Sequence, residues 1–377
     1  MDWQLLFYIA TTIVKSAIVI AVVLGVVSYS VMAERRISAA IQDRIGPNRV
    51  GIPLTRFSLW GLGQPIADAI KFLLKEDFTP AHVNRFYFII APVLAVIPPL
   101  ISIAVLPFGS IKPIEIPAWG LTLPHPGVIA DVDVGVLLIF AIASLGVYGI
   151  VLAGWASNSK YPFLGGIRSS AQMISYEIAM GLSVVPVFMV IGSLNLSEIV
   201  RYQYENGWMV LPFIQKGGNP DLLHWALWPS MILSFIIFLI SSFAETNRAP
   251  FDLPESETEL VGGYHTEYSS MKFALFFLGE YAAMIVASGL MVTLFFGGWS
   301  LPIEWFAGQE AAWWMLPLQA LVFLVKIACV IFFFMWVRWT LPRFRYDQLM
   351  KLGWCVLFEL ALANIVVVAI ILAWLQA

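Results

Sequence analysis

The apolar residues of this chain are concentrated in eight long runs, which polar connections separate. A helix needs about 20 apolar residues to cross the hydrocarbon core of a bilayer, and each run has roughly that length or more. The pattern therefore predicts an all-α membrane protein with eight transmembrane helices, at about residues 6–33, 84–106, 131–156, 168–192, 227–243, 271–297, 313–339 and 351–375.

The first polar connection carries a second pattern. Apolar residues recur at helical spacing between Gln64 and Lys75, and Asp68 and Lys71 lie on the opposite face. The segment is too short to span a bilayer, so it is predicted to be an amphipathic helix in the membrane interface. Asp68 and Lys71 also have the spacing of a local ion pair, which leaves simple anchoring of this helix as an alternative to a binding role.

Composition supports a single membrane domain over residues 1–377. The chain is 60% hydrophobic and 12% charged, a balance that excludes an ordinary soluble domain. The N-terminus lacks the basic leader and the small-residue cleavage site of a signal peptide, so the first run is expected to remain as a helix.

Residues that could hold a redox cofactor are scarce. Cys329 and Cys355 lie in or near apolar runs, and neither has a partner at metal-ligand spacing. All four histidines lie outside the apolar runs, which leaves no buried pair to ligate haem. No glycine-rich dinucleotide fingerprint follows a strand. The chain itself is therefore expected to bind no metal, haem or NADH.

The basic residues predict the orientation in the membrane. Most lysines and arginines lie in the connections after the first, third, fifth and seventh runs, whereas the other connections carry only Lys112, Arg201 and Lys216. Because positive charge favours the cytoplasmic side, both termini are predicted to lie outside. The amphipathic helix and the connection between the fifth and sixth runs are then cytoplasmic.

That connection, residues 244–260, concentrates ionisable residues between two apolar runs. Pro250 and Pro254 prevent one continuous helix, whereas Ser256 and Glu259 have the spacing of a capping box, so a short helical turn is expected to restart there. Crowded carboxylates raise one another's pKa values by repulsion. We expect an irregular loop whose carboxylates partly face a polar cavity, with a solvated acidic loop as the alternative.

Several long motifs resemble one family. They are residues 34–51 and 63–68, the run Glu245-Thr-Asn-Arg-Ala-Pro-Phe-Asp-Leu-Pro-Glu255, and residues 263–274 and 341–350. The chain resembles the H subunit of proton-pumping NADH–quinone oxidoreductase (respiratory complex I), the counterpart of mitochondrial NADH dehydrogenase subunit 1. The resemblance covers roughly Asp2 to Trp374. It is weakest in the outer loops at 107–130 and 193–226, and Cys355 and Glu359 depart from the expected pattern.

The resemblance implies a subunit of an oxidoreductase with no complete active site of its own. Quinone is the implied substrate, and NADH, flavin and iron–sulfur clusters belong to partner subunits. The implied partners are the peripheral-arm quinone-site subunits, other membrane subunits and the lipid bilayer, with no nucleic acid. The implied location is the bacterial cytoplasmic (inner) membrane. There the subunit forms the quinone-access chamber and couples quinone reduction to proton translocation.

The cytoplasmic connections at about 34–83 and 244–270 are the implied quinone site, and no catalytic acid is assigned. For Arg35 and Arg36, ordinary anchoring at the membrane surface is an equal alternative, and a loop phenylalanine such as Phe251 is more often a packing residue. The candidate quinone-binding residues are Glu34, Arg35, Arg36, Asp68, Lys71, Glu245, Arg248, Phe251, Asp252, Glu255, Glu257 and Glu259.

Ionisable residues inside transmembrane runs are costly and therefore candidates for function. Glu177 and Glu280 are expected ~12–14 Å from the cytoplasmic edge at ~1.5 Å per residue, and Lys326 at a comparable depth. We predict that these three residues transfer protons. The alternative is a buried structural ion pair, such as one between Lys326 and a glutamate.

Two other functional classes stay open at this point. One is the equivalent membrane anchor of an energy-converting hydrogenase, which the genes beside this one would distinguish. The other is a stand-alone ion carrier, for which an inverted repeat and broken helices would be expected. No such repeat is evident in the sequence.

Overall fold

A computed structural model describes residues 3–51, 60–110, 112–116, 121–123, 125–212, 222–301 and 314–376. In this part of the chain, eight helical spans are long and apolar enough to cross a membrane, which confirms the predicted all-α polytopic class. They are α1 (Trp3–Ile41), α3 (Arg85–Ile103), α4 (Gly135–Ala156), α5 (Lys160–Ile191), α7 (Leu222–Glu245), α9 (Ser270–Phe295), α11 (Met315–Thr340) and the span formed by α12 (Tyr346–Leu352), the π-helical turn η2 (Gly353–Leu357) and α13 (Phe358–Gln376).

Two helices extend further toward the cytoplasmic side than the apolar runs indicated. α1 continues from the end of the predicted run to Ile41, because residues 34–41 contain no glycine or proline that would end a helix. α5 begins at Lys160, and Pro162 lies in its first turn, where proline is well tolerated. Polar residues at these ends, Glu34 among them, are therefore on rigid helices.

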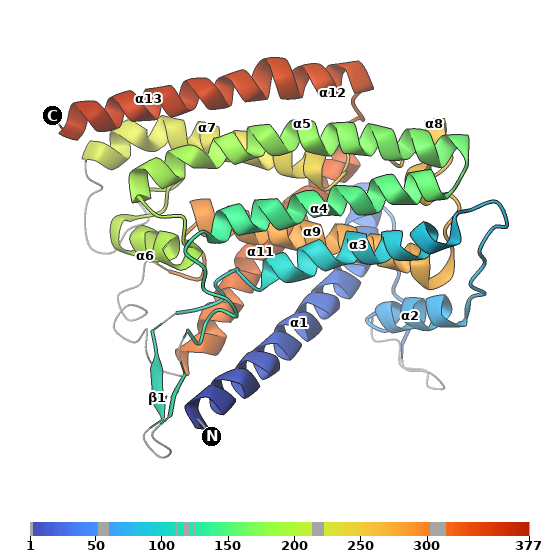
Figure 1. Ribbon diagram of the computed structural model, residues 1–377, viewed down its shortest axis with the longest axis horizontal. Coiled ribbons are helices and arrows are strands. Elements are labelled where there is room, and N and C mark those ends of the chain that lie inside the picture. The colour runs from blue at the N-terminus through green and yellow to red at the C-terminus, as the bar shows by residue number, and fades with distance from the viewer. Residues whose placement is uncertain are drawn as a thin grey trace.

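Helices α3, α4, α5, α7 and α9 form the main bundle, with α13 along α5 and α7 and with α1 crossing at an angle (Figure 1). Small residues let the helices approach closely, as is common in membranes. A Cβ added to Gly149 of α4 would lie 2.7 Å from the backbone nitrogen of Ala95 on α3. A Cβ added to Gly279 of α9 would lie 2.8 Å from the carbonyl oxygen of the same Ala95. α3 is thus held between α4 and α9.

The predicted amphipathic helix is present as α2 (Gln64–Leu74), with Pro65 in its first turn. It lies beside α1 and α9 (Figure 1). The hydroxyl of Ser270, at the start of α9, donates to the carbonyl of Phe72. The apolar stripe of α2, including Ile66, Ile70 and Leu73, stays exposed, as expected for a helix that meets lipid or another subunit.

The outer side contains the shorter elements. A two-stranded antiparallel hairpin pairs β1 (Ile114–Ile116) with β2 (Leu121–Leu123) in the connection between α3 and α4. α6 (Leu196–Asn206) packs against the end of α9. The amide nitrogen of Gln203 donates to the carbonyl of Thr293, and its oxygen accepts from the nitrogen of Gly297.

Lys326 lies near the middle of α11, and its side chain reaches the C-terminal end of α9. Its ammonium group donates to the carbonyls of Phe296, Gly298 and Ser300 at 2.7–2.8 Å. Phe296 is 16 residues beyond Glu280 along the chain, which corresponds to ~24 Å of helix at ~1.5 Å per residue. A cation is favourable where the carbonyls of a helix end lack partners. In place of the suggested pair with a glutamate, Lys326 bonds backbone oxygens at the C-terminal end of α9, away from the charge cluster described next.

Candidate functional site

The segment after α7 folds back into the protein and does not extend into solvent. Arg248, Phe251 and Ser256 are almost fully buried. Gln172 of α5 holds the fold by donating from its amide to the carbonyls of Ala244 and Phe251, at 2.7 and 2.8 Å. Since proline prevents a continuous helix here, the backbone groups of the turn need such side-chain partners.

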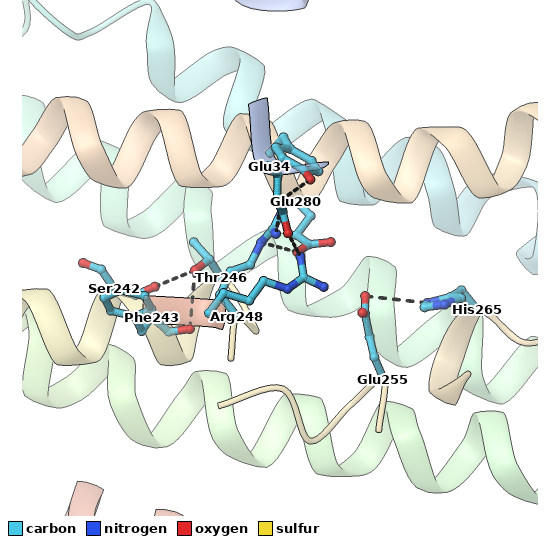
Figure 2. A network of polar contacts seen from close by, with 10 residues as sticks. Glu34, Ser242, Phe243, Thr246, Arg248, Glu255, His265 and Glu280 are labelled. Carbon is cyan, nitrogen blue, oxygen red and sulfur yellow. Dashed lines mark hydrogen bonds and ion pairs between the residues drawn. The ribbon is translucent and has the colours of Figure 1, made fainter. Parts of the chain in front are cut away.

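A buried cluster joins this segment to three helices (Figure 2). One guanidinium nitrogen of Arg248 donates to Glu34 of α1 at 3.0 Å, and its Nε lies 2.5 Å from the carboxylate of Glu280 on α9. Arg338 of α11 donates to the other oxygen of Glu34 at 2.5 Å. The hydroxyl of Tyr281 also donates to Glu34. We call these five residues the charge cluster.

The opposite charges in the cluster stabilise the charged form of Arg248. The side chains of Arg248 and Glu34 are only 3% and 7% exposed, and such groups need close partners of opposite charge. Burial opposes the charge on Arg248, but the carboxylates of Glu280 and Glu34, together with Tyr281, raise the pKa of Arg248 well above its usual value. The Nη2 atom of Arg248 is buried without a hydrogen-bond partner among the described residues, and the guanidinium carbon lies 4.2 Å from the centroid of the Tyr281 ring.

A second pair of contacts attaches the acidic segment to the connection after α11. Arg343 lies 2.8 Å from the carboxylate of Asp252 and donates to the hydroxyl of Ser256 at 3.1 Å. The nitrogen of Phe344 donates to the carbonyl of Pro250. Burial raises the pKa of Asp252, although the guanidinium of Arg343 opposes the shift.

Ser256 marks a partial error of the sequence prediction. A short helix, α8 (Glu257–Leu260), does begin after it, but its side chain makes no capping bond. Its hydroxyl accepts from Arg343 instead, so the helical turn is confirmed and the capping box is wrong. Glu259 lies apart from the cluster and forms an ion pair with Arg168, and 55% of the Glu259 side chain is exposed. The side chain of Glu257 lies outside the described residues.

Phe251 is a packing residue in this structure. Its ring lies 5.3 Å from the rings of both Tyr176 and Phe344, and only 3% of the residue is exposed. These ring contacts hold the acidic segment between α5 and the connection after α11.

Glu255 faces a histidine that sequence reasoning did not select. The Nδ1 atom of His265 lies 3.9 Å from a carboxylate oxygen of Glu255 (Figure 2). Burial raises the pKa of Glu255 well above its usual value, and repulsion from Glu280 and Asp252 adds to the shift. Burial lowers the pKa of His265 to about 4. The His265 ring is therefore neutral near pH 7, and the raised pKa of Glu255 favours its neutral form.

Glu280 also borders an internal cavity of about 100 Å³ between α3, α4, α5, α7 and α9. Glu245 and Tyr264 line the same cavity. The carboxyl of Glu177 on α5 lies close enough to that of Glu245 for electrostatic repulsion. The structure thus brings Glu280, Glu245 and Glu177 into one region of the bundle, while Lys326 is remote from it.

The surface candidates form a separate group where α1 meets α2. Arg35 lies 2.9 Å from Asp68, which also lies 3.5 Å from Lys71. Arg36 is half-buried, and its Cγ packs against Gly46 in the following turn. Neighbouring residues of α1 therefore have different surroundings, because Glu34 contacts the buried cluster and Arg35 contacts Asp68 at the surface.

An apolar groove of about 870 Å³ runs between α1, α9 and α11. Val23, Ala33, Ile285 and Met335 are among its lining residues. Ala33 precedes Glu34 and Met335 lies one turn before Arg338, so the groove runs beside the charge cluster, whose own side chains do not line it.

Sequence reasoning missed four residues of this site, namely Tyr281, Arg338, Arg343 and His265. Arg338 and Arg343 counted only as orientation signals, yet an arginine within an apolar run is itself unusual. Tyr281 directly follows Glu280, but nothing in a tyrosine of an apolar run distinguishes a buried carboxylate partner from packing.

The fold and this site define a class, namely polytopic helical membrane subunits that bury ionisable groups beside an apolar groove. Among the described residues, no group of three or more His, Cys, Asp or Glu side chains is arranged to hold a metal ion. Residues 14–369 match the family model described as NADH dehydrogenase. The chain therefore belongs to the H-subunit family of NADH–quinone oxidoreductase.

Three relatives illustrate the match. The H 2 subunit of NADH-quinone oxidoreductase from Koribacter versatilis is 45% identical, over 97% of this chain and 98% of the relative. The H 1 subunit from Geobacter metallireducens is 48% identical, over 97% of both chains. The H subunit from Rhodospirillum rubrum is 47% identical, over 93% of this chain and 90% of the relative. These names agree with the sequence identification and favour it over a hydrogenase anchor or a stand-alone carrier.

Proposed function

We propose that this chain forms the membrane side of a quinone-access chamber beneath a peripheral arm and couples quinone reduction to proton translocation. Its residues 1–377 act as one membrane domain in the bacterial cytoplasmic membrane. Electrons come from NADH through flavin and iron–sulfur clusters on partner subunits, and the chain carries no redox cofactor of its own. The observation that carries the proposal is the buried charge cluster beside the apolar groove.

The groove suits the tail of a quinone. An isoprenoid tail is apolar and needs a slot that opens to lipid, and α1 is exposed along most of its length. The polar headgroup needs partners near the cytoplasmic side, where the connections at 34–83 and 244–270 meet. The unpartnered Nη2 of Arg248 is a suitable donor to a quinone carbonyl oxygen.

Proton supply is the second half of the proposal. Quinone reduction consumes two protons, and Glu255 and Asp252 beside the cluster are suitable sources because burial raises the pKa of both. Glu280 contacts Arg248 and also borders the internal cavity. That cavity of about 100 Å³ exceeds the roughly 10–15 Å³ that a single water requires. Glu245 and Glu177 continue the line of carboxyls, and Lys326 is proposed as a later station at the outer side.

Partner docking is the third element. Arg35, Arg36 and Lys71 supply three positive charges and Asp68 one negative charge where α1 meets α2, and a charged surface favours association with a complementary peripheral subunit. The exposed apolar stripe of α2 is suited to lipid or to neighbouring membrane subunits.

Replacement of Glu280 by glutamine tests the proposal. Glu280→Gln retains size and hydrogen bonding but removes the charge that faces Arg248 and the cavity. Turnover from NADH to quinone and the proton gradient in vesicles should both fall, while electron transfer to a hydrophilic acceptor upstream persists. Full turnover with a full gradient would reject the proposal. Glu205→Gln is the control, since Glu205 forms an exposed pair with Arg201 on α6.

A further inference from the structure

The contact between His265 and Glu255 is built into the backbone. His265 ends a short 3-10 turn, η1 (Gly263–His265). Gly263 has φ of +62°, and a Cβ there would lie 1.7 Å from the carbonyl oxygen of Pro254. A Cβ on Gly165 of α5 would lie 2.8 Å from the nitrogen of Tyr264. The turn is therefore wedged between α5 and the backbone beside Glu255, and only glycine permits so close an approach.

The surroundings fix the imidazole ring in place. The rings of Tyr264, Phe273 and Phe277 lie 5.0, 5.2 and 6.0 Å from it. The side chain is 12% exposed, yet its Nδ1 is buried without a hydrogen-bond partner among the described residues. The exposed part of the ring is therefore not the nitrogen that faces Glu255.

The position of the pair defines a direction. η1 belongs to the connection between α7 and α9, which the distribution of basic residues assigns to the cytoplasmic side. Glu255 is largely buried as well, with 15% of its side chain exposed, and it interacts electrostatically with Glu280 and Asp252. His265 thus lies beside a largely buried acid that adjoins the charge cluster, on a turn of this cytoplasmic connection.

We propose that His265 is a proton-relay residue that reloads Glu255 from the cytoplasmic side after Glu255 has released its proton toward quinone. The inference rests on the proposed function, because it requires Glu255 to give up protons during turnover. No other residue type in the chain has two ring nitrogens that can accept a proton at one atom and release it from another.

The relay balances in protons and involves no change of oxidation state. The Nδ1 of the neutral ring carries hydrogen while Nε2 accepts a proton from solvent. Nδ1 then releases its proton to the carboxylate of Glu255, and rotation of the ring or exchange with solvent restores the starting tautomer. The separation of 3.9 Å exceeds hydrogen-bond length by ~1 Å, so the Glu255 carboxyl must rotate toward the ring for each transfer. The low pKa of His265 ensures that the ring does not retain the proton.

The test uses the assembled complex in vesicles with His265→Phe, which preserves the ring packing but cannot carry a proton. Turnover from NADH to quinone should fall roughly tenfold, less than the 10²–10⁴-fold typical of a direct general acid, because solvent can reach Glu255 slowly. Free imidazole added in the assay should restore turnover. His265→Gln, which is smaller and polar, should show the same loss and the same rescue. The hydrophilic-acceptor activity should remain in both variants.

His125→Phe is the matched control. His125 also lies beside a carboxylate, 3.5 Å from Asp131, but it is 47% exposed in the outer connection, so turnover should not change. Unchanged turnover in His265→Phe, or a loss that imidazole does not repair, would overturn the relay. Glu255→Gln separates the two levels of inference. If it lowers turnover while His265→Phe does not, only the relay fails; if Glu255→Gln has no effect, the proposed role of this acid fails as well.

Discussion

Glu34 offers the sharpest test of the charge cluster, because both of its carboxylate oxygens are used. One accepts from Arg248 at 3.0 Å and from the Tyr281 hydroxyl, and the other accepts from Arg338 at 2.5 Å. In Glu34→Gln, an amide NH₂ must replace one oxygen. A donor would then face a guanidinium donor, and the buried negative charge would be lost.

The structure supports a magnitude for this change. A hydrogen bond to a charged group contributes about 1.5–3 kcal/mol, and breaking a buried ion pair costs about 3–5 kcal/mol because one charge is left unpaired. Arg248 keeps Glu280, and Arg338 is 25% exposed, so water can compensate part of the loss. If about 1.4–2.8 kcal/mol of the lost interaction energy raises the activation free energy of quinone reduction, turnover decreases tenfold to hundredfold.

The assay compares turnover from NADH to quinone with electron transfer to a hydrophilic acceptor in the same vesicles. The second activity reports intact assembly and should change little. Glu34→Gln combined with Arg338→Gln should lose less than the two single losses added together, since residues in contact are energetically coupled. Turnover within twofold of wild type in Glu34→Gln, or strict additivity in the double variant, would refute the inference that the cluster supports quinone reduction.

Three further outcomes follow from other parts of the site. Asp68→Ala should lower quinone reduction while assembly and the hydrophilic-acceptor activity persist, because an exposed pair adds at most about 1 kcal/mol of stability; joint loss of both activities with the complex would indicate a structural role. Glu255→Gln and Glu257→Gln are expected to depress quinone reduction. Since the pKa of Glu255 is raised, the wild-type acid is protonated below that pKa, and turnover should fall as the pH rises through it. Glu255→Gln should lack this decrease in the pH–rate profile. Unchanged pH–rate profiles in both variants would contradict the prediction. Glu177→Gln should preserve assembly and lower both turnover and the proton gradient, whereas full values of both would identify Glu177 as structural and reject the route through α5.

The sequence by itself determined the class of this protein and the positions of its spans. Hydrophobic length and helical spacing are properties of neighbouring residues, so the eight helices and the amphipathic α2 could be predicted to within a few residues at most ends. The larger differences occur at the cytoplasmic ends of α1 and α5, where polar residues continue a helix that no longer needs to meet lipid. Long motifs such as residues 245–255 also sufficed to identify the family.

The tertiary structure alone decided which charges meet. Glu34 pairs with Arg248 and Arg338, which follow it by 214 and 304 residues, and no local spacing encodes such partners. The burial of the acidic segment likewise depends on Gln172 and Arg343 from distant elements. Lys326 and Glu280 looked equivalent along the sequence because both lie near the middle of an apolar run. They differ because Lys326 bonds backbone carbonyls at the C-terminal end of α9, while Glu280, near the middle of α9, meets Arg248.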